Sequence, residues 1–174
     1  YASSDLAERL KVSAFKSIDR YVKMWEQDFS LCVKTERPFE LEFDNALIAG
    51  AIDMIKRESD TGTSLEVIDF KTGKAENDLM EKYELQLQLY TIAAKEALGM
   101  DIQNAQVHFL DADKNQRMTI GTTEHALETA REQISYAIGG ITKMDFKRDA
   151  RNDKKCNLCD WKNFCPKRKG FKGK

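Results

Sequence analysis

Residues 67–74 read VIDFKTGK, a short stretch that combines the pattern of a buried strand with two opposite charges. Side chains alternate between the two faces of a strand, so Asp69 and Lys71 point to one side while Ile68 and Phe70 point to the other. Two opposite charges on one face at the end of a buried strand suit a place where a ligand gathers. The stretch therefore predicts a binding or catalytic site at the end of a core strand.

The chain on both sides of this stretch alternates helical and strand patterns. Helices are predicted where apolar side chains recur every three or four residues, and strands where apolar runs stand between turn signals. The predicted order is a helix over residues 5–25, strands over 30–43, 45–58 and 64–72, a helix over 81–99, strands over 105–111 and 117–123, and a helix over 124–141. Turns are predicted at Asp44-Asn45 and over 59–64, and Gly99 is expected to end the second helix. This order predicts an α/β fold with a mixed β-sheet flanked by helices.

Length and composition favour a single domain over residues 1–174. The chain of 174 residues is 41% hydrophobic and holds 2 prolines and 9 glycines, which suits one sizeable core. No stretch approaches the roughly 20 apolar residues that cross a bilayer, and the N-terminus lacks the pattern of a secretory signal. We therefore expect a soluble, cytoplasmic protein with no membrane partner. Because the first residue is not methionine, the chain could be the C-terminal part of a larger protein.

The net charge of −1 hides two regions of opposite sign. Residues 143–174 hold 12 Lys and Arg against 4 Asp, which leaves 16 Lys and Arg against 25 Asp and Glu in the rest of the chain. A basic tail, residues 147–174, beside an acidic body suits a polyanionic partner such as DNA. On charge alone, a merely solvated tail fits equally well.

Three of the four cysteines lie close together in this tail, in the segment CNLCDWKNFC. In an intracellular protein, the clustering of Cys156, Cys159 and Cys165 favours metal ligation over disulfides. Three thiolates can hold either zinc or an iron–sulfur cluster, and both need a fourth ligand. Spacing alone favours zinc, because Cys-x2-Cys is the common half of structural zinc sites.

A second acidic residue is expected to join Asp69. Asp53 lies within GAIDMI in the preceding strand, and strands adjacent in sequence usually pair, so the two carboxylates can converge. Neighbouring carboxylates repel unless a cation neutralises them, and hard oxygen ligands suit Mg²⁺ or Mn²⁺. Lys71 beside such a cation can position or help deprotonate a water nucleophile and offset charge in a phosphoryl transition state. The set predicts metal-assisted phosphodiester hydrolysis, and Gly50 would leave room for a nucleic-acid strand to approach closely.

The helix that follows adds Gln86 and Tyr90, which are four residues apart and so share one helical face. They could hydrogen-bond the backbone near the metal site or stack on a base. Taken alone, they also fit packing at the edge of the core, just as Asp69 and Lys71 alone fit an ordinary charged pair at a strand end.

These motifs together resemble the RecB-like branch of the PD-(D/E)xK nuclease superfamily. GAIDMI resembles that family's Gly-x-x-Asp strand, VIDFKTG its Asp-x-Lys-Thr-Gly strand and QLQLY its Gln-x-x-x-Tyr helix, in the same order. CNLCDWKNFCP resembles the Cys-x2-Cys-x5-Cys closure of the iron–sulfur members, which include helicase-linked and CRISPR-associated nucleases. The resemblance covers residues 36–166 and implies a restriction-endonuclease-like core with a C-terminal cysteine-cluster segment.

The resemblance implies a role for each residue of the predicted site. The catalytic cation, Mg²⁺ or Mn²⁺, would be bound by two carboxylates and one main-chain carbonyl, and a lysine would act in catalysis beside two supporting residues. The ligands are Asp53, Asp69 and the carbonyl of Phe70, the lysine is Lys71, and the supporting residues are Gln86 and Tyr90.

For the cysteines, the resemblance reverses the preference drawn from spacing. It favours a [4Fe-4S] cluster on Cys156, Cys159 and Cys165, with Zn²⁺ as the alternative. The cluster would fasten the tail to the nuclease core, because a segment so rich in loops cannot bury enough surface to order itself. Trp161 and Phe164 are expected to pack over it.

Two features depart from the iron–sulfur relatives, which carry a further cysteine and a histidine ligand before the Gly-x-x-Asp strand. Here His108 and His125 both follow the site, and we expect them to be structural or exposed. If the chain is part of a larger protein, the missing ligands lie before Tyr1 and Cys32 is a buried thiol. If the chain is complete, Cys32 is the fourth cluster ligand.

The resulting prediction is a metal-dependent DNA nuclease, an exonuclease acting on single-stranded or duplex ends. It would serve DNA repair or recombination and be linked to a helicase domain or subunit. The alternatives are a CRISPR-associated or stand-alone nuclease of the same superfamily, or a catalytically inactive DNA-binding module with a structural metal.

Overall fold

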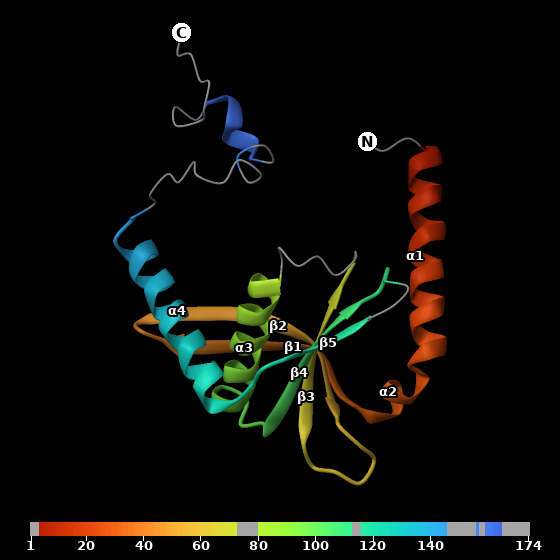
Figure 1. Cartoon of the computed structure of the whole chain (residues 1–174), viewed down its shortest axis with the longest axis horizontal. Helices are drawn as coiled ribbons and strands as arrows, with labels where there is room; N and C mark the ends of the chain where they lie inside the picture. Colours follow the sequence, from red (N-terminus) through yellow and green to blue (C-terminus); the bar gives the residue numbers. More distant parts are fainter. Residues whose placement is uncertain (1–3, 73–79, 113–115, 146–155, 157–158, 165–174) are drawn as a thin grey trace. The chain divides into compact units, whose positions relative to one another are not determined.

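The computed structural model of this chain describes residues 4–72, 80–112, 116–145, 156 and 159–164 (Figure 1). The chain divides into two compact units, Tyr1–Ser135 and Tyr136–Lys174. The sheet and the helices that cover it belong to the first unit. The long helix α4 (Glu124–Thr142) begins in the first unit and ends in the second.

A five-stranded sheet with the strand order β1-β2-β3-β4-β5 forms the centre of the first unit (Figure 1). Its first three strands, β1 (Cys32–Phe43), β2 (Ala46–Arg57) and β3 (Leu65–Lys71), make an antiparallel meander. The hairpin between β1 and β2 turns at Asp44 and Asn45, whose φ angles of 47° and 59° are those that a two-residue hairpin turn requires. The predicted meander and its turn are confirmed.

The sheet becomes mixed beyond β3. Helix α3 (Met80–Glu96) carries the chain to β4 (Ile102–Phe109), which pairs with β3 in parallel, and β5 (Arg117–Ile120) pairs with β4 in antiparallel fashion. Parallel neighbours need a crossover connection, and α3 supplies it. Gly99, with a φ of 65°, ends the turn after α3 as expected. The predicted α/β fold, a mixed sheet flanked by helices, is confirmed.

The two faces of β3 are covered by different helices. Asp69 is hydrogen-bonded to Gln86 of α3, whereas the ring of its neighbour Phe70 lies edge-on against Tyr21 of the first helix. Within β3, Val67 and Ile68 are fully buried, one on each face. Strand alternation therefore places the charged side chains at the end of β3 under α3, and it places Phe70 on the other face, against the first helix.

Two helices, α1 (Ser4–Met24) and α2 (Glu26–Leu31), precede the sheet. The sequence predicted a helix up to Trp25 and a strand from Ser30 and assigned no element to residues 26–29, so it missed α2 and was wrong for Ser30 and Leu31. A helix of six residues is too short to be stable by itself. Tertiary contacts hold it instead, since its Asp28 is buried and pairs with residues of the sheet.

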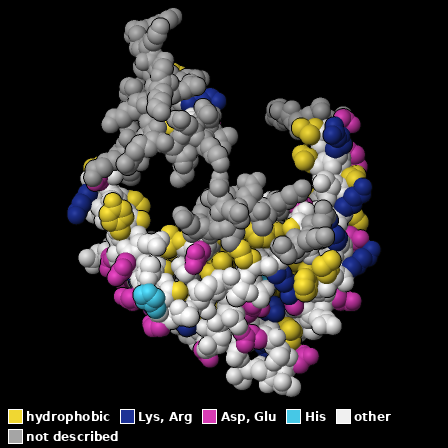
Figure 2. All heavy atoms as spheres, viewed as in Figure 1, with side chains coloured by type: hydrophobic (Ala, Val, Ile, Leu, Met, Phe, Trp, Pro, Cys, Tyr) yellow, Lys and Arg dark blue, Asp and Glu magenta, His cyan; other side chains and the backbone are white. Residues whose placement is uncertain are grey.

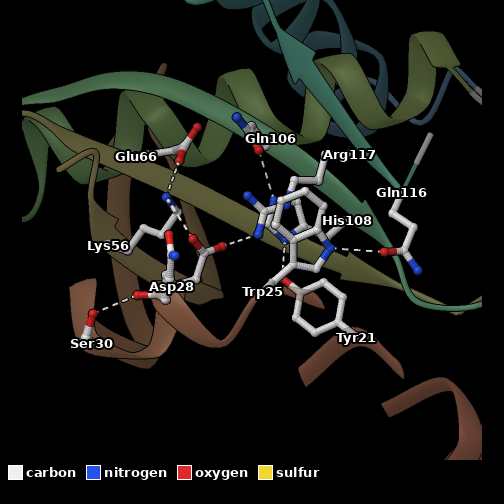
Figure 3. A network of polar contacts seen from close by, with 11 residues as sticks. Tyr21, Trp25, Asp28, Ser30, Lys56, Glu66, Gln106, His108, Gln116 and Arg117 are labelled. Atoms are coloured by element: carbon white, nitrogen blue, oxygen red, sulfur yellow. Dashed lines mark hydrogen bonds and ion pairs between the residues drawn. The ribbon is translucent and has the colours of Figure 1, made fainter. Parts of the chain in front are cut away.

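A buried network of charged and polar groups joins α2 and the end of α1 to the sheet (Figure 3). The Lys56 ammonium lies 2.9 Å from a carboxylate oxygen of Glu66 and 3.6 Å from one of Asp28. Arg117 also pairs with Asp28, and its guanidinium carbon lies 3.4 Å from the centre of the Trp25 ring. Each buried charge thus has an opposite partner, which is the condition for keeping ions inside a protein.

His108 lies in the same layer and is fully buried. Its Nδ1 accepts a hydrogen bond from the Tyr21 hydroxyl at 2.5 Å, and its Nε2–H donates to the Gln106 side-chain oxygen at 3.0 Å. The Phe70 ring packs against this imidazole, with 5.7 Å between ring centres. His108 is therefore structural and His125 is exposed, as predicted.

The stability of the protein is expected to fall in acid because of His108. Burial, together with the charges of Arg117 and Lys56, lowers the pKa of His108 to about 3. The unfolded chain protonates a histidine near pH ~6.5, so between these values only the unfolded state takes up the proton. The free energy of unfolding should therefore decrease as the pH falls from ~6.5 towards ~3.

Urea unfolding of the wild type and of His108→Gln at a series of pH values checks this expectation. The variant cannot take up the proton, so its stability should change less across this window. His125→Gln, which alters an exposed histidine, should keep the wild-type slope. An equally steep acid slope in His108→Gln would contradict the assignment.

In the second unit, the structure describes the end of α4 and a short 3-10 helix, η2 (Asp160–Asn163). The rings of Trp161 and Phe164 meet edge-on with 6.3 Å between centres, and both side chains are exposed. Most of the basic tail lies outside the described residues, so the single-domain organisation with a tail over 147–174 stays a prediction. None of the described helices has the length and apolar character needed to span a membrane.

Candidate active site

The candidate site forms where β2 and β3 stop pairing. The last paired residues are Met54 and Ile68, and Asp53 and Asp69 are the next residues along the two strands. One carboxylate oxygen of Asp53 accepts a hydrogen bond from the main-chain N–H of Phe70 at 2.8 Å. Asp53 is thereby fixed to the backbone of β3, beside the peptide group whose carbonyl is the predicted third ligand.

Asp69 and Lys71 lie side by side, as strand alternation predicts. The Asp69 side chain is almost completely buried, and its Oδ2 lies 2.5 Å from the Lys71 ammonium. The Lys71 side chain is 23% exposed, and its ammonium lies 5.6 Å from the centre of the Tyr83 ring. The pair thus combines a buried carboxylate with a cation that a ligand can reach from solvent.

Helix α3 supplies the remaining predicted residues. The Gln86 side-chain amide donates to Asp69 Oδ1 at 3.3 Å and to the Tyr90 hydroxyl oxygen at 2.9 Å. The predicted sharing of a helical face by Gln86 and Tyr90 is therefore observed, and the contact with Asp69 ties that face to β3. The structure brings together all five side chains proposed from the sequence, while their chemical roles stay predictions.

The electrostatics of Asp69 differ from those of an ordinary surface carboxyl. Burial raises the pKa of Asp69 above its usual range, the bonded Lys71 ammonium lowers it, and the nearby charge of Asp53 raises it again. The net effect is a raised pKa. A further positive charge beside Asp69 would stabilise the ionised form of its carboxyl group.

The oxygen atoms at the site fit a hard divalent cation. Asp69 Oδ2 is buried and pairs with the Lys71 ammonium. Asp53 has one oxygen left after its bond to Phe70. Among the described residues, no three His, Cys, Asp or Glu side chains cluster in a way that could hold a metal. A cation held by two carboxylates and a carbonyl, with water or phosphate completing its shell, is the usual situation for Mg²⁺.

Gly50 does not serve the purpose predicted from the sequence. A Cβ at Gly50 would lie 2.8 Å from Cζ of Phe39, its partner across the hairpin of β1 and β2. The space is filled by this ring, which lies edge-on against Tyr90 with 5.8 Å between centres. Gly50 therefore makes room for the aromatic support of Tyr90 rather than for a nucleic-acid strand.

Sequence reasoning missed two aromatic residues of the site, Phe39 and Tyr83. Tyr83 lies beside Lys71 and packs against Phe109 with 5.8 Å between ring centres. It stands three residues before Gln86 and seven before Tyr90, so helical spacing could have identified it. Phe39 depends on the register of a different strand pair, for which the sequence near the site gives no signal.

The cysteine predictions remain open. Cys32, at the start of β1, is half-buried rather than buried, and its thiol lies 3.8 Å from the carbonyl oxygen of Lys34. Cys156 and Cys159 are free thiols of the second unit, and Cys165 lies outside the described residues. The [4Fe-4S] or zinc site stays a prediction.

Comparisons with known proteins find a related sequence and two related folds. A stretch of 78 residues is 31% identical to an ATP-dependent helicase/nuclease subunit of Listeria welshimeri, covering 39% of this chain and 6% of that relative. The crystal structure of SSO0001 matches 95% of this chain and 72% of its own, with a TM-score of 0.53 and 18% identity. A proposed exonuclease from Eubacterium rectale matches 85% of this chain and 57% of its own, with a TM-score of 0.52 and 15% identity.

At these identities, the two solved structures show a shared fold. The sequence pattern of the PD-(D/E)XK nuclease superfamily matches residues 4–166, which is nearly the whole chain and includes every residue of the candidate site. The resemblance drawn from the motifs is confirmed: the chain belongs to the PD-(D/E)XK nuclease superfamily.

Proposed function

We propose that this protein is a RecB-like deoxyribonuclease that hydrolyses phosphodiester bonds with Mg²⁺ or Mn²⁺ and acts as an exonuclease on single-stranded or duplex DNA ends. The observation that carries this proposal is the convergence of Asp53, Asp69 and Lys71 at the end of β3. Membership of a nuclease superfamily supports the reaction class, and the oxygen donors support a hard cation.

The divalent cation would be held by Asp53, Asp69 and the carbonyl of Phe70. When bound, it supplies charge neutralisation for the phosphate and a lower pKa for the attacking water. In hydrolysis, the water oxygen would form a bond to phosphorus while the bond from phosphorus to the leaving sugar oxygen breaks; the water gives up a proton to solvent, and the leaving oxygen takes up a proton from solvent. The Lys71 ammonium is close enough to Asp69 to be oriented by it, and it can offset the charge that grows on the phosphoryl oxygens.

Residues of α3 would keep these groups in position. Gln86 bonds to both Asp69 and Tyr90, so it restrains the rotation of the carboxylate that faces Lys71. Restrained side chains need less rearrangement when the substrate arrives, which is how positioning lowers a barrier. Gln86 and Tyr90 are therefore proposed as positioning residues.

The cysteine cluster, the cellular role and the partner are proposed from the same family resemblance. We propose a [4Fe-4S] cluster on Cys156, Cys159 and Cys165, with Zn²⁺ as the alternative, and a role in DNA repair or recombination in the cytoplasm. A helicase domain or subunit is the proposed partner. The relative from Listeria welshimeri, whose name combines helicase and nuclease, supports such a link.

The proposal is tested by incubating the protein with end-labelled single-stranded and duplex DNA in Mg²⁺, Mn²⁺ or EDTA. We expect cleavage with either cation and none in EDTA. Asp69→Asn should lower the rate by at least about 10²-fold, because it removes a charged ligand. Asp60→Asn, which changes an exposed carboxylate in the loop between β2 and β3, should cleave like the wild type. Wild-type protein that binds DNA but cleaves it with neither cation would instead identify a non-catalytic binding module.

A further inference from the structure

A groove of about 200 Å³ lies between α1 and the carboxyl ends of β3 and β4. Its sheet side begins at Thr72, the residue directly after Lys71, and the N–H of Leu110 donates to the Lys71 carbonyl oxygen at 2.9 Å. On the helix side, the Ser17 hydroxyl donates to Asp111 Oδ1 at 2.5 Å. The groove therefore starts one residue along the chain from the candidate catalytic lysine, on the face of β3 where Phe70 packs against α1.

The side of α1 that borders the groove carries three adjacent rows of side chains. Residues three, four or seven apart in a helix lie along one strip, so each row can be read from the sequence. Figure 2 shows basic, acidic and hydrophobic side chains following one another along this helix. The rows are a basic one of Arg9, Lys16 and Arg20, a hydroxyl one of Ser13 and Ser17, and an apolar one of Leu10, Ala14 and Ile18.

The apolar row is open to solvent in the described part of the chain. The side chains of Leu10 and Ile18 are 58% and 53% exposed. On the basic row, Arg9 faces Asp5 at 4.0 Å in a largely exposed pair, which a phosphate could replace at little cost. Among the described residues that line the groove, Asp111 is the one acidic residue, and it accepts the hydrogen bond of Ser17.

A surface that combines cations with apolar and hydroxyl groups is complementary to single-stranded nucleic acid. Its phosphates pair with cations, and its unstacked bases pack on apolar side chains. A duplex would offer phosphates alone, because its bases are stacked and paired inside. The combination of rows on α1 therefore favours a single strand over a duplex.

We infer that the groove between α1 and the ends of β3 and β4 binds a single-stranded segment of the substrate, which reaches the scissile phosphate by passing around the carboxyl ends of these strands. The phosphates lie along the basic row, and the bases lie on Leu10, Ala14 and Ile18. This inference rests on the proposed nuclease function and adds a substrate-binding surface to it. It also assigns a task to the first half of α1, whose Leu10, Val12 and Phe15 side chains are exposed.

Two matched pairs of variants test this inference. Ala14→Glu puts a charge into the groove, whereas Ala97→Glu makes the same substitution at an exposed position between α3 and β4, before the amino end of β4. Lys16→Gln removes a cation of the basic row, whereas Lys34→Gln removes an exposed cation of β1. All four positions are exposed, so none of these changes should prevent folding.

Binding and chemistry are then measured separately. Binding is followed by fluorescence anisotropy of labelled oligothymidylate with Ca²⁺ in place of Mg²⁺, over a range of salt concentrations. Ala14→Glu should weaken binding by about tenfold. Lys16→Gln should weaken it by about three- to tenfold and reduce the slope of log affinity against log salt by about 0.7. Hydrolysis of bis(p-nitrophenyl) phosphate with Mn²⁺, which reports on the catalytic centre alone, should not change in any of the four variants.

The outcomes distinguish the two proposals. If Ala14→Glu and Lys16→Gln bind the oligonucleotide as tightly as Ala97→Glu and Lys34→Gln, the groove is not the binding surface. A wild type that hydrolyses neither DNA nor bis(p-nitrophenyl) phosphate, while the two pairs still differ in binding, would support the groove and overturn the proposed nuclease activity.

Discussion

Replacement of Lys71 by methionine is expected to lower the rate of DNA cleavage by about 10²- to 10⁴-fold, the range over which one acid–base or electrostatic group contributes to catalysis. Methionine keeps the length and apolar character of the side chain beside Tyr83 but lacks the ammonium that faces Asp69. Single-turnover cleavage of end-labelled DNA in Mg²⁺ measures the effect. DNA affinity in Ca²⁺ should change little, because one partly buried cation makes a small share of the phosphate contacts.

Lys71→Arg separates two roles that the lysine could have. Arginine keeps a positive charge but cannot give up its proton, since its pKa is above ~12. Partial activity in Lys71→Arg would indicate that the charge offsets the growing charge on the phosphate, whereas a loss as deep as that of Lys71→Met would indicate proton transfer. Lys34→Met, an exposed lysine of β1, serves as the control. If Lys71→Met cleaves DNA at the wild-type rate, the assignment of the site is wrong.

The parts of the site that could be predicted are those set by local periodicity. Asp69 and Lys71 share a face because strand side chains alternate, and Gln86 and Tyr90 share a face because they are one helical turn apart. Their convergence with Asp53 required only that consecutive strands pair, which is the common case. Local periodicity and the pairing of consecutive strands are therefore enough to predict which side chains form the candidate site.

The parts that were missed depend on contacts between segments far apart in the sequence. Gly50 is a glycine because the Phe39 ring of the neighbouring strand occupies the position of its Cβ. Helix α2 exists because Asp28 pairs with charges of β2 and β5. Neither the register of a hairpin nor the partners of a buried charge can be read from a window of a few residues.

Phe70 connects the candidate site to the network on the other face of the sheet. Its main-chain N–H holds Asp53, while its ring packs edge-on against Tyr21 and His108. The backbone that would present a carbonyl to the cation is therefore fixed from the opposite side of β3. Rigid support of this kind is what a site needs when its geometry must be kept to within a fraction of an ångström.

The largest effect on stability is expected from Lys56→Met, at the centre of that network. The Lys56 side chain is 6% exposed and pairs with Glu66, which is equally buried, at 2.9 Å. Removing one member of a buried ion pair leaves the other without compensation and costs about 3–5 kcal/mol in the free energy of unfolding. Urea unfolding monitored by circular dichroism measures the loss. A value within about 1 kcal/mol of the wild type would show that water or another cation takes the place of Lys56.

The double variant Lys56→Met with Glu66→Leu shows whether the pair or the packing is responsible. Replacing both charges by apolar side chains of similar volume is often neutral, so most of the lost stability should return. Asp28 keeps Arg117 as its partner in this variant, and α2 should therefore stay in place. Comparing the single and double variants isolates the coupling between the two side chains. A double variant as unstable as Lys56→Met alone would mean that packing of the lysine stem, and not its charge, stabilises this face of the sheet.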